Sequence, residues 1–476
     1  MLIRILLLWL SALMPVAAKL PPLPDMGAPS DRILSPLEEE RLGQAFFRNL
    51  HRHVRVSDDP MIQDYIASLG GRLTGHSDMA NRPFHFFVVM EPEINAFAGP
   101  AGYIGVHSGL IVATHSESEL ASVLAHEIAH VTQNHLKRAF ASAKRLSIPL
   151  AAAMLAAILV GTQSPEAAQA AIIAIQAGGL QQQINFTRAH EQEADRIGLQ
   201  ILADSGFDPR SMPAFFERLQ QSTRLSGQRN VPEFLRTHPV TSSRIADTRA
   251  RAADYPYRQY TDSLAYLLVK AKLEVLSSRE PARLLPLFRQ RLRRGTPMQR
   301  AAARYGLALI HQSLHRLGES RELLRRLLRQ FPDQPQFVDA LAGVELAQGD
   351  TESALQRYRL ALKHFPASTM LQLAYSQALL HSGRFNEARR RLLQLMARGN
   401  VPPSLYKHLS QAYAGMGKTA EAQRYLAEYH YATGDLEQAI RYARLALKMA
   451  RGDRILTAVA RERLRFFQQE EKARKH

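Results

Sequence analysis

The hydrophobic positions divide the chain into two regions of different texture. Up to about Tyr255, short runs with strand character alternate with helical patterns, whereas beyond it Leu and Ala recur almost throughout at the three- and four-residue spacing of helices. The length of 476 residues also favours at least two domains. The pattern predicts an α+β, mostly helical protein, in which a domain over 19–255 is followed by an all-α domain over 256–476.

The strand signals of the first region lie shortly before a predicted helix. Residues 84–89 (FHFFVV) have the composition of a strand, and residues 95–112, punctuated by glycine, predict a strand pair or hairpin. Ser116 is followed three residues later by Glu119, which is the signature of a capping box. A helix over 117–136 is therefore expected.

Glycines recur at a fixed period in the second region. Gly349, Gly383 and Gly417 lie 34 residues apart, and an alanine follows five residues after each of them. A unit of this length resembles the tetratricopeptide repeat, whose helix pairs stack into a curved solenoid with a protein-binding concave face. Gly318 fits an earlier copy with imperfect spacing. Gly434 follows Gly417 by half a repeat, which indicates irregular or capping units near the C-terminus.

Composition narrows the chemistry that the chain can perform. Because the sequence contains no cysteine, a disulfide framework, a thiolate metal site and a cysteine nucleophile are excluded, and any metal must be held by His, Asp and Glu. The net charge of +18 suggests a nucleic-acid binder, but no recognition motif supports one. We expect no nucleic-acid partner, and instead peripheral contact with anionic lipid, lipopolysaccharide or acidic protein surfaces.

The first residues have the pattern of an export signal. Arg4 precedes an apolar run over 5–13, and small residues up to Ala18 suit a cleavage site. The run is shorter than the about 20 apolar residues of a membrane-spanning helix. We therefore expect a signal peptide over 1–18, cleaved near Ala18, with an uncleaved anchor as the alternative.

The predicted helix 117–136 carries a metal-binding motif. His126, Glu127 and His130 form the pattern H-E-x-x-H, and imidazoles four residues apart project from one face of a helix. Zinc suits imidazole and carboxylate ligands, and it lowers the pKa of water towards about 7. Glu127 lies one residue round the helix, where it can take the proton as a general base. The motif predicts one Zn²⁺ per chain and a hydrolytic enzyme.

A second helical segment offers the missing carboxylate ligand. Residues 188–199 place Glu191 and Asp195 four positions apart, on one helix face. We assign Glu191 to the metal and Asp195 to a hydrogen bond from the free N–H of a ligand histidine. Glu193 is expected to point elsewhere. A solvated acidic helix face is the alternative for the whole segment.

These two motifs together resemble the gluzincin metallopeptidases of the HtpX and CaaX prenyl-protein protease type. The matching segments are 126–135 (HEIAHVTQNH), 191–198 (EQEADRIG) and 237–244 (THPVTSSR). The export signal and the C-terminal repeats narrow the resemblance to periplasmic proteases of this type that carry such repeats, and this narrower resemblance covers essentially the whole chain. It implies a periplasmic endopeptidase that takes unfolded or misassembled outer-membrane β-barrel proteins as substrates and docks to the barrel-assembly machinery through its repeats.

The resemblance also assigns two residues of the third segment. A histidine of the T-H-P segment can approach the zinc as a fourth ligand and hold such an enzyme latent, and here that residue is His238. Arg244 matches an arginine of the same segment, for which an oxyanion or substrate role and a plain salt bridge are equal alternatives. His135, five residues after His130, would lie on another helix face, and we interpret it as structural.

A long apolar stretch separates the two ligand segments. Residues 148–160 and 167–180 are each shorter than the ~18 residues of a spanning helix. We expect a helical pair that acts as a lid over the cleft, with a membrane contact as the alternative. For the whole protein, the alternative to a peptidase is a non-proteolytic chaperone or assembly factor with a latent or structural zinc site.

Overall fold

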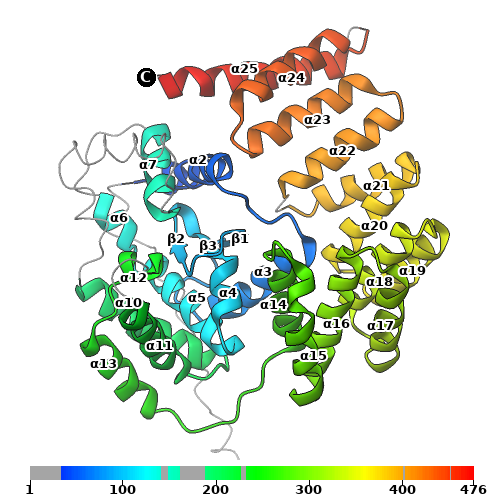
Figure 1. Cartoon of the computed structure of the whole chain (residues 1–476). Helices are drawn as coiled ribbons and strands as arrows, with labels where there is room; N and C mark the ends of the chain where they lie inside the picture. Colours follow the sequence, from blue (N-terminus) through cyan, green and yellow to red (C-terminus); the bar gives the residue numbers. More distant parts are fainter. Residues whose placement is uncertain are drawn as a thin grey trace, which may run out of the picture.

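The computed structural model describes residues 34–140, 148–160, 188–226, 232–399, 402–450 and 452–475. A small sheet surrounded by helices is followed by an arc of helix pairs (Figure 1). The predicted signal peptide and the second half of the predicted apolar pair lie outside the described residues. Among the described helices, none combines the length and apolar character needed to cross a membrane.

The sheet has three strands in the order β1-β3-β2. β1 (His85–Val89) pairs in parallel with β3 (Tyr103–His107), and β2 (Ala96–Ala98) pairs antiparallel with β3 at one edge. The strand pair expected over 95–112 is thus present only in its first part, because Ser108–Ala113 forms helix α4. A short apolar run suits a buried strand or a buried helix equally well, and its periodicity does not distinguish the two.

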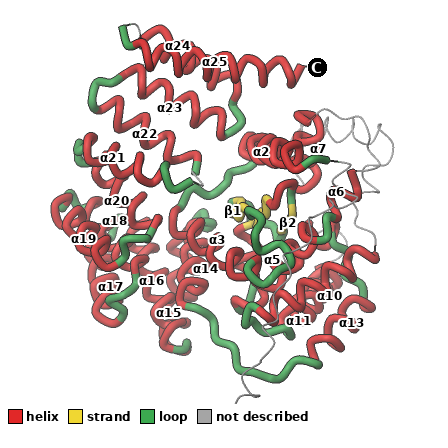
Figure 2. The backbone as a smooth tube through the Cα atoms, turned by 180° about the vertical axis from the view of Figure 1, so that it is seen from behind, coloured by secondary structure: helices red, strands yellow, loops and turns green. Residues whose placement is uncertain are grey.

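Helices cover both faces of this sheet (Figure 2). Val88, Ile104 and Val106 face a core shared with α3 (Pro60–Thr74) and α5 (Glu117–Thr132). Phe87, Val89 and Phe97 face a second cluster with α2 (Pro36–His53) and α7 (Ile148–Val160). Since successive side chains of a strand point to opposite faces, the apolar run FHFFVV supplies both clusters.

Two details of the helices position the site. The expected helix over 117–136 is shorter in the structure: α5 ends at Thr132, Asn134 adopts a left-handed φ of 53°, and a new helix, α6 (His135–Phe140), begins. Helix α10 (Arg188–Asp204) packs closely along α5, because a Cβ on Gly198 would lie 3.0 Å from the backbone nitrogen of His126. The two predicted ligand helices are therefore side by side.

Further helices complete the N-terminal region and form the repeats. Three cover α5 and α10: α11 (Ser211–Ser226), α12 (Glu233–Thr237) and α13 (Ser242–Ala253). The rest follow as antiparallel neighbours: α14 (Leu264–Leu276), the 3-10 helix η4 (Pro281–Leu284), α15 (Leu285–Arg294), α16 (Pro297–Ser313), α17 (Leu317–Gln330), α18 (Pro335–Ala347), α19 (Thr351–His364), α20 (Thr369–His381), α21 (Phe385–Met396), α22 (Pro403–Gly415), α23 (Thr419–Ala432), α24 (Leu436–Met449) and α25 (Arg454–Lys475).

The periodic glycines form the turns inside the helix pairs. Gly349, Gly383 and Gly417 have φ values of 81°, 73° and 74°, in the left-handed region that glycine adopts without strain. The predicted earlier copy is present as α16 and α17, but its turn is not at Gly318, which lies within α17. The equivalent turn, 34 residues before Gly349, is made by His315 with a φ of 57°.

The arc of repeats returns to the N-terminal region at its far end. In the turn between α23 and α24, Gly434 lies so close to α2 that a Cβ would be 2.0 Å from the carbonyl oxygen of Arg48. The Arg48 guanidinium lies over the ring of Tyr431 at 4.6 Å and pairs with Glu470 at 3.4 Å. Near its start, the arc is held by an ion pair between Lys272 of α14 and Asp59 before α3. Contacts at both ends thus join the repeats to the N-terminal region.

Candidate metal centre

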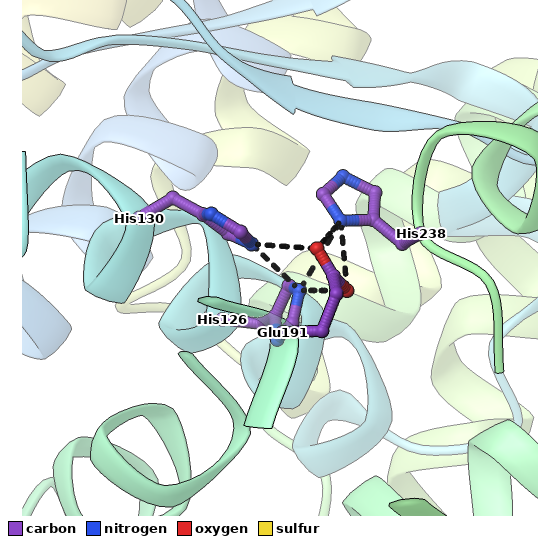
Figure 3. Close-up of side chains that lie close together, drawn as sticks. All are labelled: His126, His130, Glu191 and His238. Atoms are coloured by element: carbon purple, nitrogen blue, oxygen red, sulfur yellow. Dashed lines mark hydrogen bonds and ion pairs between the residues drawn. The ribbon is translucent and has the colours of Figure 1, made fainter. Parts of the chain in front are cut away.

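Four buried side chains converge beside α5. His126, His130, Glu191 and His238 each offer a ligand atom, and these atoms lie within 4.8 Å of one another. The Nε2 atoms of His126 and His130 are 3.0 Å apart, and each lies 3.5 Å from an oxygen of Glu191. Figure 3 shows the carboxylate of Glu191 between the two imidazoles and the ring of His238. The structure therefore brings together both histidines of the motif, the predicted carboxylate and the predicted fourth residue.

Three different elements supply these groups. His126 and His130 lie one turn apart on α5, and Glu191 lies in the first turn of α10. His238 ends α12, where its backbone N–H donates to the carbonyl of Phe234 at 2.8 Å. The Phe234 ring packs against the imidazole of His238 at 5.0 Å, which fixes its orientation towards the cluster.

The donor set fits a divalent metal ion. Imidazole nitrogens and a carboxylate oxygen are the groups that bind such ions in sites without cysteine. Burial disfavours a charged imidazole, but Asp195 and Glu191 outweigh it and raise the pKa of His126 to about 9. Burial and the neighbouring His126 hold the pKa of His130 well below its usual range. A cation between these rings would be bound by the Nε2 atoms of both His126 and His130, which explains why the two imidazoles lie so close together.

A second layer of charged groups holds the ligands in place. Asp195 Oδ1 lies 3.0 Å from Nδ1 of His126, on the side of the ring away from the cluster. Arg244 donates to both oxygens of Asp195 at 2.7 and 2.8 Å, and its third nitrogen lies 2.8 Å from Glu191. Despite the burial of Asp195, these partners lower the pKa of its carboxyl. Of the two alternatives for Arg244, the structure shows the salt bridge, made to two acids at once.

Sequence reasoning missed a second support, formed by His135 and Glu193. His135 Nδ1 lies 2.8 Å from Nδ1 of His130, and its Nε2 lies 3.0 Å from Glu193. The predicted position of His135 assumed a continuous helix. The break at Asn134 changes the direction of the chain, so that the His135 side chain lies against His130. Asn is one of the few residues that adopts the left-handed conformation readily, so Asn134 was the available signal.

Removal of this support is expected to weaken metal binding. In His135→Ala, the His130 ring loses the hydrogen bond that orients it, and we expect the metal affinity to fall about 10–100-fold. The measurement is competition with a chromophoric chelator. His135→Asn, which retains a polar side chain, should recover part of the affinity, and the exposed His115→Ala is the control. Unchanged affinity in His135→Ala would show that His130 needs no such partner.

Glu127 lies beside the cluster without being part of it. Its carboxylate is buried and accepts a hydrogen bond from the backbone N–H of Ala98, in the edge strand β2. Its Oε1 lies 3.5 Å from Nε2 of His238 and has no hydrogen-bond partner within the described part of the chain. Burial raises the pKa of Glu127, which suits a group that takes up a proton.

Comparison with known proteins identifies two protein families along the chain. Residues 60–252 match peptidase family M48, and residues 290–449 match a tetratricopeptide repeat family. The β-barrel assembly-enhancing protease of Escherichia coli K12 is 36% identical over 419 residues, which cover 88% of this chain and 85% of the relative. The protein of that name from Yersinia pestis is 36% identical over 88% of this chain and 86% of its own length. A putative one from Vibrio cholerae is 35% identical over 84% and 82%.

The helix-borne H-E-x-x-H motif, the acidic ligand helix and these matches define a metalloprotease. More particularly, the chain belongs to the β-barrel assembly-enhancing protease family within peptidase family M48. The C-terminal helix pairs are tetratricopeptide repeats.

Proposed function

We propose that this protein is an exported, zinc-dependent endopeptidase that acts in the periplasm on unfolded or misassembled outer-membrane β-barrel proteins. The convergence of His126, His130 and Glu191 on one point carries the proposal, because two imidazoles and one carboxylate form the ligand set of catalytic zinc sites. The names of the relatives support the choice of substrate, and the apolar run before Ala18 supports export. We place the boundary between peptidase and repeat domains at residues 255 and 256.

The residues around the metal have separate roles in this proposal. Zinc, when bound, would lower the pKa of a water molecule and provide positive charge that stabilises the developing oxyanion. Oε1 of Glu127 accepts the proton from the attacking water molecule and delivers it to the leaving nitrogen. Asp195 and Arg244 hold His126 and Glu191 in position. The N–H of Ala98 holds the Glu127 carboxylate in place by a hydrogen bond.

We also propose that His238 holds the enzyme latent. Its Nδ1 lies 3.0 Å from Glu191 and 3.4 Å from Nε2 of His126, so the imidazole would occupy the place that a water molecule needs beside a bound metal ion. His238→Ala is expected to raise the rate of hydrolysis of an unfolded barrel protein about tenfold or more, which corresponds to an activation barrier lowered by about 1.4 kcal/mol or more. The measurement is the initial rate of cleavage, followed by electrophoresis.

The neighbouring, largely exposed Arg236 provides the control for this experiment. Arg236→Ala lies two residues away on α12 and touches none of the four groups, so its rate should match that of the unaltered protein. A His238→Ala protein that keeps its metal but cleaves no faster would rule out latency through this residue.

Binding of client chains is assigned to the concave side of the repeats. A cavity of about 760 Å³ lies between α14, α16, α18 and α20, lined by Ala and Leu side chains together with Tyr305, Asp339 and Lys272.

The alternative function, a chaperone without proteolytic activity, is favoured by the same contact of His238 with the cluster, because a permanently closed metal site would leave only the binding of client chains. Retention of barrel assembly by a Glu127→Gln protein would show that binding and cleavage are separate functions of the chain.

A further inference from the structure

One stretch at the start of the repeats carries positive charge and contains no acidic residue of its own. Between Glu280 and Glu319 the sequence contains eight arginines and no Asp or Glu. Only two of the eight reach an acid from a neighbouring segment: Arg283 pairs with Glu280, and Arg291 pairs with Glu274. For the other arginines of this stretch, the described residues provide no ion pair.

The fold gathers several of these arginines on one edge of the solenoid. α15 ends at Arg294 and α16 begins two residues after Gly295, so Arg293, Arg294 and Arg300 flank a single short turn. The end of α17 lies beside the same part of α16, because Arg304 donates to Gln330 at 2.9 Å. We call Arg293 and Arg294 of α15, Arg300 and Arg304 of α16 and Arg326 of α17 the basic edge.

The guanidinium groups of the basic edge repel one another. Burial lowers the pKa of Arg304, and the positive charges of Arg326 and Arg300 lower it further. The helix dipole explains the bases at the ends of α15 and α17, where cations are favoured. It does not explain Arg300, which lies in the first turn of α16, at the positive end. The arrangement therefore costs free energy in the isolated protein, and an anionic partner would offset that cost.

Exposed apolar side chains accompany the charges. Leu287 is 39% exposed and lies seven residues before Arg294, on the same face of α15, and Met298 in the first turn of α16 is 44% exposed. Apolar side chains beside Arg are typical of surfaces that lie in the headgroup layer of a bilayer, where hydrocarbon and phosphate are both available. The phosphates of a nucleic acid or the carboxylates of an acidic protein would leave Leu287 and Met298 exposed to water.

We propose that the basic edge binds the headgroup layer of an anionic lipid membrane. Each basic side chain near such a surface strengthens binding about fivefold, so three of them supply a factor on the order of a hundred. The surface lies on the repeats, and none of its residues belongs to the metal centre. It would hold the enzyme at a membrane without a spanning helix.

The test is sedimentation of the full-length protein with lipid vesicles. Vesicles of phosphatidylcholine alone are compared with vesicles of equal parts phosphatidylcholine and phosphatidylglycerol, each at low and high salt. The variant Arg293→Gln/Arg294→Gln/Arg300→Gln removes three charges of the basic edge. The matched control, Arg444→Gln/Arg461→Gln/Arg465→Gln, removes three exposed charges from α24 and α25, at the other end of the arc.

We expect the unaltered protein to sediment with the phosphatidylglycerol vesicles at low salt and to be released at high salt. The basic-edge variant should bind on the order of a hundredfold more weakly, and the control within a few-fold of the unaltered protein. Both variants should keep the metal content and the thermal midpoint of the unaltered protein. Equal loss in both variants, or binding to a polyglutamate chain but not to vesicles, would overturn the proposal.

Discussion

Replacing Glu127 with glutamine is expected to abolish peptide hydrolysis while the fold and the metal content stay unchanged. The amide has the shape of the carboxylate and can still accept the hydrogen bond from Ala98, but it cannot take up a proton. Loss of a general base costs about 10²–10⁴-fold in rate. The rate should be measured in the unaltered chain and together with His238→Ala, so that a closed site does not hide the effect.

An exposed carboxylate provides the control for Glu127→Gln. Asp204 lies at the end of α10 in the same domain, and Asp204→Asn makes the corresponding change of acid to amide away from the metal centre. Its rate should equal that of the parent protein. If Glu127→Gln in the His238→Ala protein cleaves as fast as its parent, Glu127 is not the base.

Glu191→Ala is expected to remove the metal itself. The three histidines of the cluster remain, but the charge that balances the cation on the α10 side is lost, and Arg244 keeps its positive charge close to the vacated position. The decrease in affinity should exceed the about 10–100-fold caused by the loss of a supporting partner such as His135. Elemental analysis after gel filtration gives the metal content, and chelator competition gives the affinity.

The adjacent residue on α10 is a matched control for this loss. Gln192 is exposed and points away from the cluster, so Gln192→Ala should retain the metal. Far-UV circular dichroism distinguishes a missing ligand from an unfolded protein. A Glu191→Ala protein that is folded and still binds metal with unchanged affinity would refute the ligand set on which the catalytic proposal rests.

Much of the site was visible in the sequence because helical periodicity converts spacing into direction. The four-residue intervals from His126 to His130 and from Glu191 to Asp195 each place two side chains on one face. The packing of α5 against α10 could not be derived in this way. It depends on the absence of a side chain at Gly198, a contact between residues distant in sequence.

The errors arose where a local pattern was extended past a break. The helix predicted to residue 136 hid the role of His135, because the turn at Asn134 changes the direction of the chain. The repeat period was assigned to glycine and therefore missed His315, which adopts the same left-handed turn. In both cases a residue other than glycine adopts the left-handed backbone conformation. The role of His238 came from the family resemblance, since a histidine in a loop carries no directional signal of its own.

The contact between Gly434 and Arg48 alters how the solenoid can open. The last unit of a repeat array has a neighbour on one side only and normally frays first. Here the α23–α24 turn rests on α2, which in turn packs with α7 over the sheet. Local unfolding of α24 and α25 would therefore also loosen α2 and α7. We expect the amide hydrogens of α24 and α2 to exchange with similar protection, as one cooperative unit, whereas a free end of the array would exchange faster than the rest.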